Sequence, residues 1–336
     1  MPENKKHLSR RDFLKIVATI SGAAVVWRFG LEKFESASIT TDSRILMGTV
    51  INLTLIGPNR EKALEAISDV FARMGVLETV LSRFIPGGDL SKLNQEGVLQ
   101  FPQAIFVDLL LLAQDTSLLT NGAFDVTVKP LIDVYEDRVR KEGGLPDISE
   151  IDNILPLIDF TKLHATSDRV WFDHAGMGAT LDGIAKGYIV DQGVNLLREH
   201  GYTNVMMEAG GDLMALGERG TNLPWMIGIQ APRANMGELL AKIDLANKAI
   251  ATSGDYMQPY SRDMRHHHIV NPHTGFSSPF LASATVIAPS CWQADALATA
   301  LMVTNVQTGL ALVKEIRDTD AILVTKDLKI ISTLES

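Results

Sequence analysis

Two oxygen-bearing side chains stand four residues apart in the segment CWQADALATALMV, where Asp295 and Thr299 are expected on one face of a helix. A carboxylate, a hydroxyl and a backbone carbonyl are hard oxygen donors that suit Mg²⁺, which keeps waters or phosphate oxygens in its other positions. The alternative is a capping or solvated aspartate and a threonine that bonds back to its own helix. Nearly all flanking residues are apolar, and a buried aspartate needs a partner, which a cation would provide.

A second segment, TLDGIAKGYIVD, places Lys186 between Gly183 and Gly187 in the first turn of a predicted helix. Cations are normally favoured at the other end of a helix, because the helix dipole is positive at its start. The lysine is therefore either solvated or acts together with the exposed backbone N–H groups to hold an anion.

The segment RHHHIVNPHTG contains three adjacent histidines, His266, His267 and His268, ahead of a turn. Adjacent residues of a strand cannot share one face, so the three form a poor chelating cluster. One of them could act as a general base at neutral pH, and surface exposure is the ordinary alternative. Asp255 in ATSGDY, Asp212 in AGGDL and Phe124-Asp125 in GAFDVTV could each be part of an ordinary turn.

Periodicity predicts the elements that must position these residues. We expect a strand over 44–57, a loop from 84 to 94 and weakly patterned connecting structure over 136–165. The other expected strands are 170–172, 204–208, 213–216, 225–230, 240–245, 248–252 and 283–288, and the expected helices are 60–83, 104–119, from the lysine segment to about 200, 293–303 and 307–317, with a hairpin around 326–327. Long helices between runs of strands predict an α+β fold with mixed, largely antiparallel sheets rather than a doubly wound parallel sheet.

Composition excludes several classes of protein. The 336 residues carry a net charge of -9, and residues 1–38 contribute +3, so the remainder carries -12. Such an acidic body is a poor candidate for binding nucleic acid. Cys291 is the only cysteine, so an intrachain disulfide is impossible and a zinc–thiolate site is not expected. No G-x-G-x-x-G follows the first strand, so a dinucleotide-binding unit is not supported.

The amino terminus reads as an export signal. Arg10 and Arg11 precede a short apolar stretch over 16–27, an order that resembles a twin-arginine leader. We therefore expect a signal or anchor helix over 1–38, followed by a domain of two closely packed subdomains over 39–336, in an extracytoplasmic or periplasmic location. No clean cleavage site follows the apolar stretch, so contact with the membrane through an uncleaved leader stays open.

Taken together, the segments RILMGTVINL, GAFDVTVKPL, TLDGIAKGYIVD, ATSGDY…HHHIVNPHTG and ADALATALMV resemble, in this order, the FAD:protein FMN transferase (ApbE-like) family. The resemblance covers about residues 45–327 and implies a T-fold-like architecture. It also implies a reaction in which FAD is split at its diphosphate, FMN passes to a Thr or Ser hydroxyl of a partner flavoprotein, and AMP leaves. Mg²⁺ is the implied cofactor.

The resemblance also assigns roles to individual positions. Asp295 and Thr299 match side-chain ligands of Mg²⁺, Gly183 matches a position that donates its backbone carbonyl to the ion, and His268 matches the base that deprotonates the acceptor hydroxyl. Asp255 is assigned with His268 to the catalytic residues. The positions assigned to FAD are Met47, Phe84, Ala123, Phe124, Asp125, Lys186 and Ile269.

The chain departs from the family pattern at three places. Asp182 stands where a small residue is usual, Gly88 where a serine is typical, and Asn271 where an aspartate is common. An added carboxylate beside a phosphate site is unfavourable unless a cation neutralises it. The TLDGIAKGY variant resembles a subgroup that loads flavin onto membrane-bound electron-transfer proteins. Two alternatives remain: a Mg²⁺-dependent FAD pyrophosphatase, and an exported flavin-binding protein without catalysis.

Overall fold

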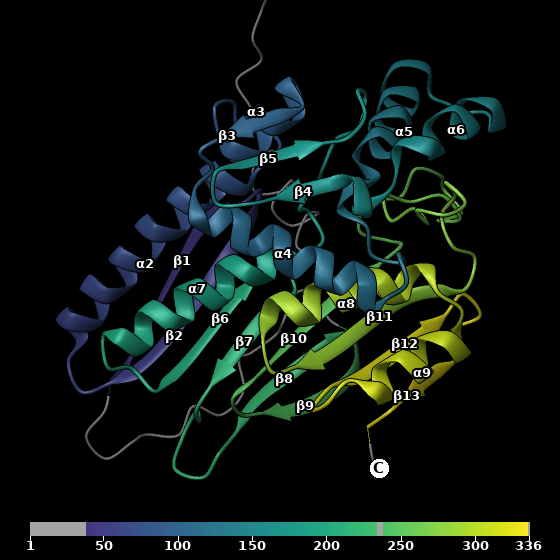
Figure 1. Cartoon of the computed structure of the whole chain (residues 1–336). Helices are drawn as coiled ribbons and strands as arrows, with labels where there is room; N and C mark the ends of the chain where they lie inside the picture. Colours follow the sequence, from purple (N-terminus) through teal and green to yellow (C-terminus); the bar gives the residue numbers. More distant parts are fainter. Residues whose placement is uncertain (1–37, 234–237, 335–336) are drawn as a thin grey trace, which may run out of the picture.

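A computed structural model describes residues 38–233 and 238–334 (Figure 1). The strands are β1 (Ser38–Leu46), β2 (Thr49–Gly57), β3 (Val98–Gln100), β4 (Leu163–Ala165), β5 (Arg169–Phe172), β6 (Asn204–Ala209), β7 (Asp212–Leu216), β8 (Trp225–Gln230), β9 (Leu239–Leu245), β10 (Lys248–Gly254), β11 (Leu281–Ala288), β12 (Asp320–Thr325) and β13 (Ile330–Ser332). The helices are α2 (Arg60–Leu81), α3 (Asp89–Glu96), α4 (Ala104–Leu119), α5 (Lys129–Glu142), α6 (Ile148–Ile154), α7 (Ala185–Glu199), α8 (Cys291–Val303) and α9 (Val306–Glu315), with 3₁₀ turns η1 (Val126–Val128), η2 (Leu155–Leu157) and η3 (Phe160–Lys162).

The described residues build one large sheet and two small ones. The large sheet has eight strands in the order β1-β2-β6-β7-β10-β11-β12-β13, and every neighbouring pair in it is antiparallel. The small sheets are β3-β5-β4 and the hairpin β8-β9. The predicted α+β class with largely antiparallel sheets is therefore confirmed.

The large sheet is buried on both faces, because its strands alternate between two apolar clusters. In β6, Val205 and Met207 join the larger cluster with α2, α7 and α8, whereas Met206 joins the cluster around Trp225 of β8. Figure 1 shows α2, α7 and α8 side by side along one side of the sheet. Of these, α7 and α8 carry the lysine segment and the Asp–Thr pair, so the sheet supports both.

The single strand predicted over 44–57 is two strands, the end of β1 and the whole of β2, joined by a hairpin turn. Met47 and Gly48 both have positive φ, of 52° and 69°, and connect Leu46 directly to its partner Thr49. Two consecutive residues of positive φ form the turn whose twist matches that of paired strands. The prediction failed because both halves of the hairpin have a β pattern, and the Met-Gly pair is a weak turn signal.

The region predicted as loop and connecting structure contains helices. Residues 89–96 form α3, and residues 129–154 contain α5 and α6. Their apolar side chains Leu131, Tyr135 and Ile151 form a small separate core with Val270. The glycine at position 88, where a serine is typical of the family, has a steric explanation. A Cβ there would lie 1.9 Å from the carbonyl oxygen of Thr79.

A long connection, residues 255–280, joins β10 to β11 and carries the three histidines. Isolated bridges between Pro259 and His267 and between Val270 and Ser277 hold it in shape. A long ordered connection of this kind is usually functional.

Within residues 38–233 and 238–334, no helix combines the length and apolar character that crossing a bilayer requires. The predicted export helix lies outside the described residues.

Candidate active site between α7 and α8

At Gly187, helix α7 comes into direct contact with the backbone of α8. An added Cβ at Gly187 would lie 2.3 Å from the carbonyl oxygen of Cys291, and one at Gly183 would lie 2.9 Å from Oγ1 of Thr299. Only glycine permits such an approach. The glycine-flanked lysine segment and the late Asp–Thr pair therefore meet, although about a hundred residues of chain separate them.

Asp295 is the buried carboxylate of this contact. Its side chain is 4% exposed, and its Oδ2 accepts the Gly187 N–H at 3.1 Å. Burial raises the pKa of Asp295 to about 8, and the nearby charge of Asp212 adds to this, whereas Lys186 and the Gly187 N–H oppose it. Nearby positive groups therefore do not fully compensate the negative charge of the Asp295 carboxylate.

The Gly187 hydrogen bond has a consequence for Gly183. In a regular helix the N–H of residue 187 would donate to the carbonyl of residue 183, but here it donates to Asp295. Within the described part of the chain no N–H donates to the Gly183 carbonyl. Gly183, whose carbonyl thus accepts no backbone N–H, packs against the side chain of Thr299.

Lys186 is ion-paired with Asp212, a buried residue at the start of β7. Burial disfavours its charge, but Asp212 and Asp295 outweigh this effect and raise the pKa of Lys186 above its ordinary value. The lysine is therefore an ammonium group at the start of α7, held by a carboxylate. The sequence predicted an anionic partner for it, and in this structure the partner is Asp212, which had been interpreted as an ordinary turn residue.

These groups fit a hard divalent cation. Asp212 and Asp295 place two buried carboxyl groups against the single ammonium of Lys186. The hydroxyl oxygens of Thr299 and Ser253 lie 3.4 Å apart, and Gly183 packs against Thr299. Among the residues that the structure describes, no three His, Cys, Asp or Glu side chains group as a metal site. A mixed set of carboxylate, hydroxyl and carbonyl oxygens is the kind that Mg²⁺ accepts together with waters and phosphate oxygens.

Asp182, the unusual carboxylate of the lysine segment, forms an ion pair with Arg83. Arg83 Nε donates to Asp182 at 2.8 Å, and its NH2 group donates to Glu136 of α5 at 2.7 Å. The guanidinium also lies over the ring of Phe84, 4.1 Å from its centroid. Arg83 was missed because its partner is 99 residues away in the chain. Its single positive charge offsets the extra carboxylate in part, because it is shared with Glu136 and Asp133. The charge of Asp182 still acts on Asp295.

The remaining residues assigned to FAD differ in burial and in the contacts they make. Phe124 is buried against Gly183, and Ile269 lies in the same apolar cluster. Phe84 is 67% exposed. Met47 lies in the β1–β2 turn, where its N–H donates to Glu78. Ala123 packs beside the main core.

Asp125 acts as a cap. Its Oδ1 accepts the N–H and hydroxyl of Thr127, and its Oδ2 accepts the N–H of Phe160. Burial raises its pKa, against these hydrogen bonds. Its contacts hold the turn that presents Phe124, and direct contact with a ligand stays a prediction.

His268 belongs to the 255–280 connection and is half-buried. Burial lowers the pKa of His268 to about 4; Asp182 raises it and Lys186 lowers it, so these charges act on the ring. The imidazole is neutral at pH 7 and can accept a proton. Its Nδ1 is buried without a hydrogen-bond partner.

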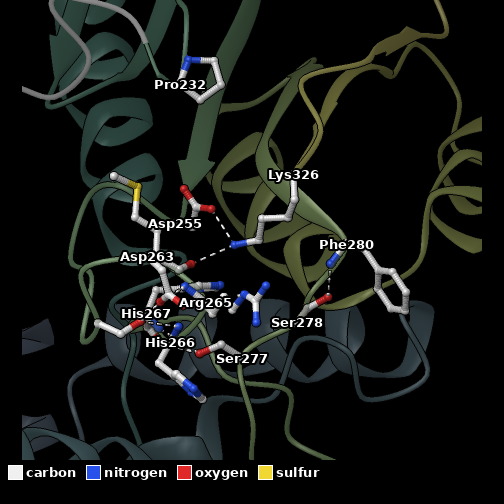
Figure 2. A network of polar contacts seen from close by, with 12 residues as sticks. Pro232, Asp255, Asp263, Arg265, His266, His267, Ser277, Ser278, Phe280 and Lys326 are labelled. Atoms are coloured by element: carbon white, nitrogen blue, oxygen red, sulfur yellow. Dashed lines mark hydrogen bonds and ion pairs between the residues drawn. The ribbon is translucent and has the colours of Figure 1, made fainter.

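Asp255 anchors the base of this connection (Figure 2). The Asp255 side chain is fully buried. Its two oxygens each accept a hydrogen bond from the Arg233 guanidinium at 2.7 Å, and Lys326 Nζ donates to Oδ2 at 2.5 Å. Lys326 also donates to the Met264 carbonyl at 2.9 Å, which ties the histidine connection to the C-terminal hairpin. These contacts favour a role in positioning the connection. The assignment of Asp255 as a catalytic residue stays a prediction.

The chain belongs to the ApbE family, because the model of that family matches residues 47–323. The FAD:protein FMN transferase of Vibrio cholerae (serotype O1, strain O395) is 30% identical over 275 residues, 79% of this chain and 81% of the relative. That of Haemophilus influenzae is 32% identical over 286 residues, 79% and 78% of the two chains. The solved flavin transferase ApbE from Vibrio cholerae superposes with a TM-score of 0.78 at 28% identity, covering 89% of this chain and 98% of that one. The family inferred from the sequence segments is confirmed.

The helix contact predicts the effect of adding one methyl group. Gly187→Ala should push α7 from α8, break the hydrogen bond to Asp295 and lower the unfolding free energy by about 1–3 kcal/mol, because the added atom overlaps backbone. Gly75→Ala in α2 is the matched control, since its Cβ would meet only Leu46 Cδ1 at 4.0 Å, and it should be neutral or stabilising. Urea denaturation measures both, and equal stability of the two variants would contradict the close contact.

The buried histidines predict a loss of stability in acid. Burial lowers the pKa of His267 to about 3 from an ordinary 6.5. As the pH falls between these values, the unfolded chain binds a proton that the folded chain does not, so stability falls by up to about 1.4 kcal/mol per pH unit. His267→Leu should flatten this slope between pH 6.5 and 4, whereas the same change at exposed His174 should not. An unchanged slope in His267→Leu would show that this ring does not drive the effect.

Proposed function

We propose that this protein transfers FMN from FAD to a Ser or Thr hydroxyl of a partner flavoprotein and releases AMP. Its relatives in Vibrio cholerae and Haemophilus influenzae are FAD:protein FMN transferases. One observation carries the proposal to this chain: the glycine-flanked segment meets α8, with Gly183 against Thr299, Gly187 hydrogen-bonded to Asp295, and the ammonium of Lys186 close enough to act on Asp295. Such a set suits a divalent ion and the diphosphate of a nucleotide.

In this proposal each residue has a separate task. Asp295, Thr299 and the Gly183 carbonyl would hold Mg²⁺, which supplies positive charge at the diphosphate. Lys186 adds a second positive charge from the start of α7, and Phe124 closes the site beside Gly183. Positive groups aimed at phosphate oxygens are the main means by which proteins accelerate phosphoryl transfer.

The chemical step balances with one proton acceptor. The hydroxyl oxygen of the partner forms a bond to the FMN phosphorus, and the bond from that phosphorus to the bridging oxygen breaks. AMP leaves with the bridging oxygen and its electron pair. The hydroxyl proton passes to His268, which is neutral because burial lowers its pKa to about 4.

The partner and location form the less direct part of the proposal. The twin-arginine pattern at 10–11 supports work outside the cytoplasm, and the resemblance to a subgroup supports a membrane-bound electron-transfer subunit as acceptor. No basic surface for nucleic acid is expected from the net charge of -9.

The function is tested with FAD, Mg²⁺ and a purified electron-transfer subunit that carries an acceptor threonine. Intact-mass measurement should show addition of FMN to the subunit, with equimolar AMP. His268→Ala should slow transfer by about 10²–10⁴-fold with FAD affinity within about twofold. Asp295→Ala should abolish Mg²⁺-dependent turnover, and the exposed-site control Asp244→Ala should leave it unchanged.

Two results would overturn the proposal. Free FMN released at the same rate with and without the acceptor would identify a pyrophosphatase, in which water replaces the hydroxyl. Tight FAD binding with no AMP release under any of these conditions would identify a flavin carrier.

A further inference from the structure

A buried carboxylate outside the proposed reaction, Asp191, joins α7 to the first turn of α8. Its Oδ1 accepts the N–H of Cys291 and its Oδ2 accepts that of Trp292, each at 2.9 Å. These are the first two residues of α8, whose own N-cap residue Ser290 makes no side-chain cap. The first N–H groups of a helix lack partners within the helix, and here a neighbouring helix supplies them.

Asp191 completes a repeating contact between the two helices. Gly183, Gly187 and Asp191 recur every four residues along α7 and the turn before it, and Cys291, Asp295 and Thr299 recur every four residues on α8. The stripes are antiparallel. Gly183 lies beside Thr299, Gly187 contacts Cys291 and Asp295, and Asp191 binds the start of α8. Residues four apart share one helix face, so both stripes are continuous.

Burying the Asp191 carboxylate costs free energy unless the N–H groups of Cys291 and Trp292 donate hydrogen bonds to it. Asp191 is 8% exposed, and burial raises its pKa to about 6, whereas the Trp292 and Cys291 N–H groups and the charge of Arg198 lower it. A carboxylate at a helix start is stabilised by the aligned backbone dipoles, typically by about 0.3–2 kcal/mol. The contact is therefore a directional tether between helices as well as a cap.

The tether bears on the proposed cation site through geometry. Asp295 lies about one helical turn after the tethered residue Cys291, and Thr299 lies about two turns after it. A rigid helix fixed at its first turn and at the Gly187 contact has little freedom to shift along α7. A small slide would separate the Asp295 and Thr299 oxygens from the Gly183 carbonyl.

We propose that Asp191 is a positioning residue for the cation site, which fixes α8 against α7 so that Asp295 and Thr299 meet the Gly183 carbonyl. The inference rests on the proposed function only in taking this site to bind a divalent cation.

The first measurement is Mn²⁺ binding to the full chain, followed by the electron paramagnetic resonance signal of free Mn²⁺. Asp191→Asn keeps the size of the side chain but replaces one acceptor oxygen with an amide donor, so Mn²⁺ should bind about tenfold more weakly. The matched control is Asp89→Asn, another buried carboxylate, which accepts the Gln103 N–H beside α4 at 2.7 Å. It should bind Mn²⁺ within about twofold of the unmodified chain.

A second variant separates positioning from helix stability. Asp191→Asn combined with Ser290→Asp gives α8 a cap of its own but no tether to α7. Thermal stability should recover in this double variant, while Mn²⁺ affinity should stay low. Recovery of both would overturn the inference, because a cap alone would then suffice.

Hydrogen exchange without metal provides a readout that does not depend on the cation. Amides of α8 should exchange faster in Asp191→Asn than in Asp89→Asn, and those of α2 should be equal in both. If the unmodified chain binds no Mn²⁺ but α8 loses protection as expected, the tether stands and the cation site of the proposed function fails. If Mn²⁺ binds equally to Asp191→Asn and the unmodified chain, the positioning role fails and the proposed function stands.

Discussion

The contact of α7 with α8 at Gly187 is the constraint on which the site depends. A Cβ at this position would lie 2.3 Å from the Cys291 carbonyl, so the two helices can meet only where one of them has no side chain. The close approach lets the Gly187 N–H reach Asp295 instead of its own helix, so the Gly183 carbonyl loses this donor while Gly183 packs against Thr299. One glycine thus determines both the position of the carboxylate and the availability of the carbonyl. The antiparallel sheet beneath holds the two helices in this register.

The second feature of the site is its unbalanced buried charge, which favours the binding of charged ligands. Asp295 and Asp212 are buried together, and burial with their mutual repulsion raises the pKa of Asp295 to about 8. Lys186 compensates for one of the two charges and stays an ammonium group at the start of α7. A divalent cation would complete the balance, and a diphosphate would then find positive groups on two sides. Arg83 pairs with Asp182 and links the lysine segment to α5, although the charge of Asp182 still contributes to raising the pKa of Asp295.

The sequence predicted the elements with strong periodicity and much of the local chemistry. The helix over 104–119 and the strand over 225–230 match α4 and β8 at both ends. The four-residue spacing put Asp295 and Thr299 on one helix face, and the family resemblance placed Gly183 with them; Gly183 does pack against Thr299. The hairpin at Met47 was missed because two strands with one β pattern merge when the turn signal is weak. The partners of Lys186 and Arg83 were missed for another reason: they are acidic residues distant in the chain, which only the tertiary fold brings to these cations.

The most direct test of this account is anomalous diffraction from crystals of the protein soaked with Mn²⁺ and FAD. A single strong Mn²⁺ peak is expected in contact with the side-chain oxygens of Asp295 and Thr299 and the carbonyl oxygen of Gly183, bridging to the diphosphate of the flavin nucleotide. A well-ordered FAD with its diphosphate away from α7 and α8, or a Mn²⁺ peak elsewhere on the protein, would contradict it.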